Sequence, residues 1–169
     1  SDHRSQYGHF DSNTDYITLA SADTRSTGTY SFWVYPTERT DDRLIMGNDP
    51  YYSRIFLTIT NGYLRVETNT NGQEFQFNSN APPLNTWSHV ALVRAGNSIS
   101  YYLNGSFIST VNVASANSVT IRQIGYNGRS FRGDIDEVSI YDRAITADEV
   151  SLIYHNGDGL VYSMLNICD

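Results

Sequence analysis

Three acidic side chains lie within four positions near the end of the chain, in the stretch FRGDIDEVSIYDRAITADEV that covers residues 131–150. Carboxylates this close can form a catalytic pair, bind a metal ion, or simply be polar positions of a strand. Alternate side chains of a β-strand share a face. We therefore expect Asp134 and Asp136 on one face with Val138 in the next position, and Glu137 on the other face.

Two predicted loops, at residues 48–54 and 126–130, carry the side chains best suited to binding a sugar. Sugars are held by aromatic rings packed on their apolar faces and by planar groups that hydrogen-bond their hydroxyls. Tyr51 and Tyr52 are adjacent, so on a strand they cannot both face the core. The alternative interpretation is that the tyrosines are half-buried cross-strand partners. The predicted ligand-binding residues are Asn48, Asp49, Tyr51, Tyr52, Arg54, Tyr126, Asn127 and Arg129.

Other chemistries have weaker support in the sequence. There is no GxSxG nucleophile motif or Gly-rich phosphate loop, and the four histidines lack the spacing of a zinc site. We interpret His89 as a strand histidine with a satisfied hydrogen bond, and we expect Trp87 to pack inside the fold. The tripeptide Arg132-Gly133-Asp134 spells an integrin-type motif, but matches of three residues often arise by chance.

The composition excludes several classes of partner. A chain of 169 residues suits one domain. The net charge of −7 argues against a nucleic-acid partner and against an anionic membrane surface. No apolar run approaches the ~20 residues of a membrane-spanning helix, so we expect no membrane insertion. The single cysteine, Cys168, cannot form an internal disulfide.

The hydrophobic pattern predicts strands joined by tight turns. Alternating apolar and polar residues flank Asn-Gly pairs at 61–62, 71–72 and 104–105, which are strong hairpin signals. Turns about every ten residues are typical of a sandwich or barrel. One helix is predicted after Thr146, where Thr-Ala-Asp-Glu has the form of a capping box. We expect this helix to end at Gly157 and to cover one end of the sandwich.

Three stretches form a series along the chain. They are FDSNTDYI at 10–17, NTWSHVALV at 85–93 followed by the hairpin at 102–105, and the acidic stretch with its helix at 131–150. In order and spacing they resemble the laminin-G-like jelly rolls of the concanavalin A-like lectin/glucanase superfamily. The resemblance covers roughly residues 6–157. It implies an all-β fold, a two-sheet antiparallel jelly-roll sandwich with one short C-terminal helix.

The resemblance also sets the expected domain limits. Residues 1–157 are expected to form the laminin-G-like jelly roll, and residues 158–169 a C-terminal strand or tail. The apolar first strand that usually opens this family is missing ahead of Phe10, whereas GLVYSMLN at 159–166 resembles it. The tail therefore either completes this sheet or is the first strand of a following copy.

The acidic stretch can be compared with the catalytic and calcium sites of these relatives. Glucanases of the superfamily use E-x-D-x-E on one strand, whereas here Asp134 replaces the leading Glu and Val138 the last one. We therefore expect a protein that is not an enzyme. Laminin-G-like jelly rolls often hold a calcium ion, and the resemblance places a structural Ca²⁺ at Asn13, Asp15 and Asp136. The alternative is that Asp136 accepts backbone N–H bonds without a metal.

The predicted function is non-catalytic binding of a carbohydrate or glycoconjugate, or adhesion, within a larger secreted or surface protein. Its location would then be extracellular or on a cell or virion surface. Two alternatives remain: a module that binds a protein partner or has a structural role, and a polysaccharide hydrolase or lyase. This prediction rests on the family because a fold alone does not fix a function.

Overall fold

The computed structural model describes residues 7–12, 14–38, 43–48, 54–57, 63–68, 73–77, 80–113, 118–126, 128 and 130–155. Within these residues the chain forms twelve strands and one helix, α1, which spans Ala147–Tyr154. The strands, in chain order, are β1 (Gly8–Phe10), β2 (Tyr16–Arg25), β3 (Gly28–Pro36), β4 (Arg43–Gly47), β5 (Arg54–Leu57), β6 (Leu64–Glu67), β7 (Glu74–Phe77), β8 (Ser88–Ala95), β9 (Ser98–Leu103), β10 (Ser106–Asn112), β11 (Val119–Gly125) and β12 (Gly133–Tyr141).

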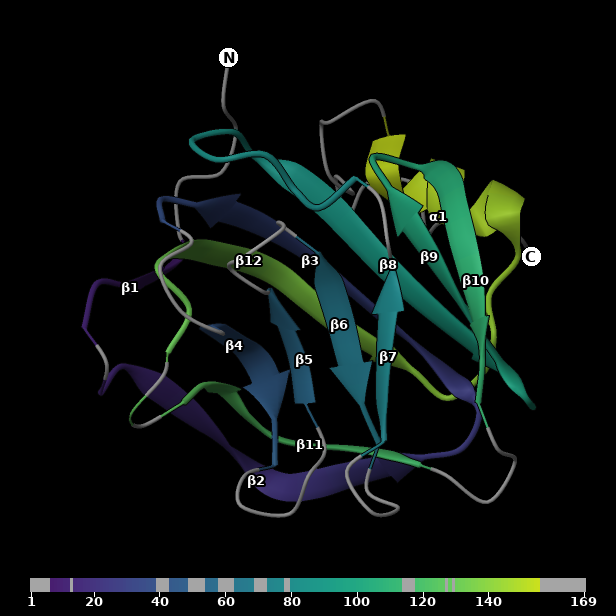
Figure 1. The fold of residues 1–169 in the computed structure, drawn as a ribbon, viewed down its shortest axis with the longest axis horizontal. Coiled ribbons are helices and arrows are strands. Elements are labelled where there is room, and N and C mark those ends of the chain that lie inside the picture. The colour runs from purple at the N-terminus through teal and green to yellow at the C-terminus, as the bar shows by residue number, and fades with distance from the viewer. Residues whose placement is uncertain are drawn as a thin grey trace, which may run out of the picture.

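The strands form two antiparallel sheets, each with six strands in the described part of the chain. The first sheet has the order β1-β12-β3-β8-β9-β10, and the second sheet the order β2-β11-β4-β5-β6-β7. In Figure 1 the sheets form two layers, with α1 beside β9 and β10 and far from β1. The predicted all-β jelly-roll sandwich with one short C-terminal helix is confirmed.

The hydrophobic core lies between the two sheets. Alternate residues of β3, namely Tyr30, Phe32 and Val34, point into it, as the sequence pattern predicts. The second sheet contributes Ile55 and Val66 among others. Each large apolar side chain buried here stabilises the fold by about 1.5–3 kcal/mol. Because side chains alternate along a strand, the residues between them point to the outer faces.

The strands that flank each of the three Asn-Gly pairs form antiparallel hairpins. Among these three, the pair at 104–105 has the strand register of a two-residue turn made by Asn and Gly. Asn104 and Gly105 have φ angles of 50° and 75°, and Leu103 pairs with Ser106, as expected for a two-residue type I′ turn. Leu57 pairs with Leu64, and Glu67 with Glu74. A two-residue turn at 61–62 or 71–72 would shift these pairs by two residues, so neither register fits a turn centred on the Asn-Gly pair, and the turn residues themselves lie outside the described part of the chain. A shift of two keeps every side chain on its predicted face.

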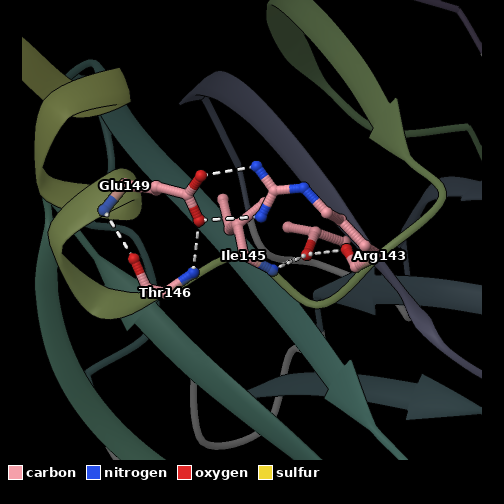
Figure 2. Close-up of polar contacts among 5 residues, drawn as sticks. Arg143, Ile145, Thr146 and Glu149 are labelled. Carbon is pink, nitrogen blue, oxygen red and sulfur yellow. Dashed lines mark hydrogen bonds and ion pairs between the residues drawn. The ribbon is translucent and has the colours of Figure 1, made fainter.

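The helix begins with the predicted capping box (Figure 2). The Thr146 hydroxyl accepts from the Glu149 backbone N–H at 3.2 Å, and the Glu149 carboxylate accepts from the Thr146 N–H at 2.8 Å. Arg143 donates to both oxygens of the same carboxylate. The hydrogen bond from Arg143 is the main reason that the pKa of Glu149 falls to about 2. The capping box thus gives partners to two backbone N–H groups at the start of the helix, those of Thr146 and Glu149.

The helix covers the outer face of the first sheet and not an end of the sandwich, so its expected position was wrong. Val150 is fully buried in a second apolar cluster with Ala91 and Val93 of β8 and Tyr102 of β9. At the end of the helix the ring of Tyr154 lies so close to Gly105 that a Cβ there would sit 2.9 Å from it. The outer faces of β8 and β9 are apolar enough to hold a helix, which alternation alone does not reveal.

The end of the helix and the tail can be compared with the sequence only in part. The helix ends at Tyr154, and His155 takes the left-handed conformation with φ 40°. The expected stop at Gly157 and the tail at 158–169 lie outside the described residues. No helix in the described part of the chain is long and apolar enough to cross a membrane.

Candidate functional site

The acidic stretch forms β12, and a β-bulge breaks its alternation. Asp134 pairs with Tyr35 and Asp136 with Trp33, but the next pair is Ser139 with Ser31. Two residues of β12 thus oppose one of β3, and Glu137 takes a φ of 48°. Our expectation that Val138 lies on the acidic face was therefore wrong.

Val138 packs against the core, and Ser139 takes the next position on the outer face. The outer face of β12 thus presents Asp134, Asp136 and Ser139, in that order. An E-x-D-x-E arrangement needs three acids on one regular strand face, and this strand offers two followed by a hydroxyl. The bulge therefore separates β12 from the glucanase pattern more clearly than the sequence does.

Asp134 is engaged by a histidine from the first strand. The His9 Nδ1 atom lies 2.5 Å from the Asp134 Oδ1 atom, and the hydrogen bond raises the pKa of His9. The His9 side chain is 58% exposed and the Asp134 side chain 15%. A carboxylate held this way favours a charged imidazolium beside it, which suits a fixed polar contact on the surface.

The two carboxylates predicted to bind calcium both accept backbone N–H bonds. Asp15 accepts from the N–H groups of Ser12 and Asp11 and from the Ser12 hydroxyl, at 2.8–2.9 Å. The N–H of Ser12 is the main reason that the pKa of Asp15 is lowered. Asp136 accepts from the N–H of Glu137 at 2.8 Å.

These carboxylates do not make a calcium site by themselves. Among the described residues, no three acidic, histidine or cysteine side chains form a metal-binding group. Asn13, the third predicted ligand, lies outside the described residues. Calcium prefers six to eight oxygens, so carbonyl oxygens and Asn13 would have to supply most of them, and the calcium site stays a prediction.

The two predicted sugar-binding loops lie at opposite ends of β4. Asn48 directly follows β4, and Arg54 opens β5 opposite Gly47. The segment after Tyr126 returns to the other end of β4, where Phe131 N donates to the Leu44 carbonyl. Four residue steps of a strand separate these ends by about 13 Å. The structure therefore keeps Tyr126 apart from Asn48 and Arg54; Asp49, Tyr51, Tyr52, Asn127 and Arg129 lie outside the described residues.

A row of polar side chains crosses the outer face of the second sheet next to Arg54. Directly paired residues of neighbouring strands share a face, and Arg54 pairs with Glu67, which pairs with Glu74. On the other side of β4, Gln123 pairs with Gly47. The adjacent pair is Arg65 with Gln76. We call this set the polar face: Arg54, Arg65, Glu67, Glu74, Gln76 and Gln123.

Ion pairs hold the polar face in place. Arg54 Nη1 lies 3.1 Å from Glu67 Oε2, and Arg65 Nη1 lies 3.1 Å from Glu74 Oε2. The Glu67 side chain is only 5% exposed and that of Glu74 46%. Within the described part of the chain, the side-chain oxygen of Gln123 is buried and has no hydrogen-bond partner. The result is a set of planar donors and acceptors fixed on a rigid sheet.

Sequence reasoning identified only Arg54 of this face. The signal for the others was available in the hairpin of β6 and β7. In LRVE and EFQF the polar residues alternate with apolar residues that face the core, Leu64 and Val66 in the first strand and Phe77 in the second. What the sequence lacks is the pairing of β11 with β4, which brings Gln123 to the same face.

An aromatic cluster occupies part of the outer face of the first sheet. The ring of Trp87 lies 5.8 Å from that of Tyr7 and 5.6 Å from that of Tyr35, between ring centres. Trp87 is half-buried and lies outside both apolar clusters, so the prediction that it packs inside was wrong. Trp87 lies just before β8, two positions ahead of His89, and so points to the same outer face as His89.

His89 is buried beneath the end of the helix. The residue is 1% exposed, its Nε2 atom lies 2.8 Å from the Ser31 hydroxyl, and the rings of Trp33 and Tyr154 stand 5.4 and 6.1 Å away. Desolvation lowers the pKa of His89 to about 4. A Ser–His pair so enclosed gives no access to a substrate, which agrees with a structural histidine.

Solved structures of several proteins share this fold. A SAP-like pentraxin of Limulus polyphemus is 16% identical, with a TM-score of 0.64 over 87% of this chain and 78% of the pentraxin. A putative carbohydrate binding protein of Bacteroides ovatus is 20% identical, with a TM-score of 0.64 over 80% of this chain and 42% of that protein. Domain 4 of AbnA, an extracellular arabinanase of Geobacillus stearothermophilus solved with arabinotriose, is 23% identical, with a TM-score of 0.59 over 80% and 68%.

No curated protein matches the chain. The solved structures are too distant in sequence to establish more than the fold, and the chain spans less than half of the Bacteroides protein. The Laminin_G_3 family model, in contrast, matches residues 11–151. Because this range covers most of the chain, the protein belongs to the family described as the concanavalin A-like lectin/glucanases superfamily.

Proposed function

We propose that this domain is a non-catalytic carbohydrate-binding module that works within a larger secreted or surface protein. The observation that carries the proposal is the polar face beside the β4–β5 connection. Arg54, Arg65, Glu74 and Gln76 there present planar groups on one rigid surface, and the buried Glu67 holds Arg54 from below. Sugar hydroxyls both donate and accept, so a surface that mixes guanidinium, carboxylate and amide groups suits them.

Pre-organisation strengthens this interpretation. The Arg54–Glu67 and Arg65–Glu74 pairs fix their side chains before a ligand arrives, so less rotamer entropy is lost on binding. The predicted Tyr51 and Tyr52 belong to the connection that starts at Asn48 and ends at Arg54. An aromatic contact from that connection would complement the hydrogen bonds of the polar face.

The arrangement of β12 supports a non-catalytic role. Cleavage of a glycosidic bond uses two carboxyl groups at a set separation. Asp134 is bonded to His9, and the bulge puts Ser139 where the glucanase pattern continues with an acid. The extracellular arabinanase domain solved with arabinotriose has the same fold and supports a binding role and an extracellular location for this chain.

Binding on a glycan array tests the proposal. Glu74 and Gln76 are exposed, so the double variant Glu74→Ala/Gln76→Ala should fold normally. Each lost hydrogen bond is worth roughly 1 kcal/mol, so the affinity should fall about ten-fold or more. Thr110→Ala on β10 is the matched control, since it removes an exposed hydroxyl from the other sheet. Unchanged affinity in the double variant would contradict the assignment of the polar face.

A structural calcium ion at Asn13, Asp15 and Asp136 is a second part of the proposal. Binding at 100 times the dissociation constant would stabilise the fold by about 2.7 kcal/mol. We therefore expect a higher melting temperature in CaCl₂ than in EGTA, and loss of this difference in Asp15→Asn. Equal melting temperatures in both solutions would remove the site.

A protein-interaction module is the second candidate. Phe107 of β10 and Leu152 of α1 are 58% and 61% exposed, and their elements touch. Exposed large apolar side chains on adjacent elements favour protein contacts. Light scattering at rising concentration checks self-association; a monomer throughout, with no loss of solubility, would speak against this role.

A further inference from the structure

The outer face of the first sheet has two different halves. The α1 helix covers one half, where Ala91 and Val93 pack against Val150. The helix ends at Tyr154, and the centre of its ring lies 5.7 Å from the ring centre of Trp33. Beyond this point the rings of the aromatic cluster reach the surface.

We define the aromatic platform as Tyr7, Tyr35 and Trp87. Tyr7 is 49% exposed, and the other two rings are half-buried. Trp87 touches both tyrosines, with ring planes at 66° and 54°. The cluster therefore links three segments, the start of the described chain, β3 and the approach to β8, into one apolar surface that is fixed by mutual contacts.

The rim of the platform is polar and acidic. Asp134 is the register partner of Tyr35 and holds His9 at 2.5 Å. His9 also approaches Asp11, at 3.7 Å, and Asp136 is the next acid along the same strand face. The carboxylates offer acceptors to hydroxyls that project from a stacked ring, and their charge repels anionic ligands.

We propose that the aromatic platform is a second carbohydrate site, which stacks the rings of a neutral polysaccharide. Aromatic rings pack on the C–H face of a sugar ring, while the rim accepts hydrogen bonds from its edge. The excess of carboxylates selects against sulfated and uronate chains. The platform and the polar face lie on opposite outer faces of the sandwich, so one sugar ring cannot occupy both.

The aromatic platform differs from the polar face in its place on the sandwich and in its chemistry. The polar face binds through planar hydrogen-bonding groups, and the platform binds through stacking. A domain with both sites can hold two chains, or two distant parts of one chain, and gain avidity. The two sites use different residues, so each can be tested while the other is intact.

Trp87 provides the readout. The chain has two tryptophans, and Trp33 is only 2% exposed. Acrylamide quenching of the fluorescence thus reports mainly on Trp87. The probes are soluble xylan, β-glucan and arabinan, with polygalacturonate as the anionic comparison. A neutral chain that stacks on the platform should protect Trp87 from the quencher, and polygalacturonate should not.

Variants separate the platform from the polar face. Tyr7→Ala removes an exposed ring, and Tyr7→Phe keeps the ring as the matched control. Affinity electrophoresis should show roughly ten-fold weaker binding in Tyr7→Ala and near-native binding in Tyr7→Phe. Trp87→Phe should bind more tightly than Trp87→Ala, with equal melting temperatures required for the comparison.

Each outcome decides a definite point. Binding that depends on Tyr7 and Trp87 but not on Glu74 and Gln76 supports the platform and overturns the polar face. Binding that depends only on Glu74 and Gln76, without protection of Trp87, overturns the platform and leaves the proposed function standing. Binding to none of the neutral probes, or equal binding of polygalacturonate, overturns the inference.

Discussion

Acidification between pH 7 and pH 5 should destabilise the fold through His89. The imidazole is buried between Ser31, Trp33 and Tyr154. Desolvation lowers its pKa from 6.5 in the unfolded chain to about 4 in the folded protein. The unfolded state therefore binds the proton first as the pH falls, and each such proton shifts the equilibrium toward unfolding.

The size of the effect follows from the two pKa values. The stabilising contribution is fully present above pH 6.5 and disappears as the pH falls through the folded-state pKa. Linkage gives a loss of about 2 kcal/mol between pH 7 and pH 5, and about 3 kcal/mol below pH 4. Glu149, whose folded-state pKa is about 2, loses its contribution only below pH 4.5, so the window from pH 7 to pH 5 separates the histidines from Glu149.

Urea unfolding at pH 7, 6 and 5 measures this loss. His89→Gln should be less stable than the native protein at pH 7 but should change little across the window. His9→Asn is the control. The hydrogen bond to Asp134 raises the pKa of His9 in the folded protein, so protonation of His9 stabilises the fold as the pH falls, whereas protonation of His89 destabilises it. Two results would refute the reasoning. One is a change of less than about 0.5 kcal/mol in the free energy of unfolding of the native protein across this window. The other is a pH dependence that is just as strong in His89→Gln.

Three further substitutions test two local features by thermal unfolding. Thr146→Ala removes the acceptor for the Glu149 N–H and should cost about 1 kcal/mol; no change would mean that the capping box is dispensable. Gly133→Ala should cost far more than Gly96→Ala. Both glycines have positive φ, but a Cβ at 133 would lie 1.9 Å from the Tyr35 carbonyl oxygen whereas one at 96 meets nothing within 4 Å. Equal losses would contradict the crowding at β12.

Features that depend on nearby residues could be predicted from the sequence. The capping box and the Asn104–Gly105 turn follow from hydrogen bonds and φ angles within a few positions. The faces of β3 also follow from simple alternation. Together with the three family stretches, these local signals were enough for the fold class.

Features that depend on neighbouring strands could not be predicted. The bulge at Glu137 inserts one residue in β12 relative to β3 and reverses the expected direction of Val138. The separation of Tyr126 from Asn48 depends on β11 running antiparallel to β4. Such pairings join segments many residues apart, and no turn residue or spacing in the sequence specifies them.

The pairing of β1 with β12 has a consequence for how the protein is made. Gly8 is opposite Ile135 and Phe10 opposite Gly133, so the first described strand has no partner until most of the chain has left the ribosome. A domain closed by such distant contacts folds slowly, because a long loop must be ordered before the contacts form. Until β1 and β12 complete the first sheet, apolar side chains that it buries, such as Phe10 and Ile135, stay open to water, so an incomplete chain is prone to aggregate.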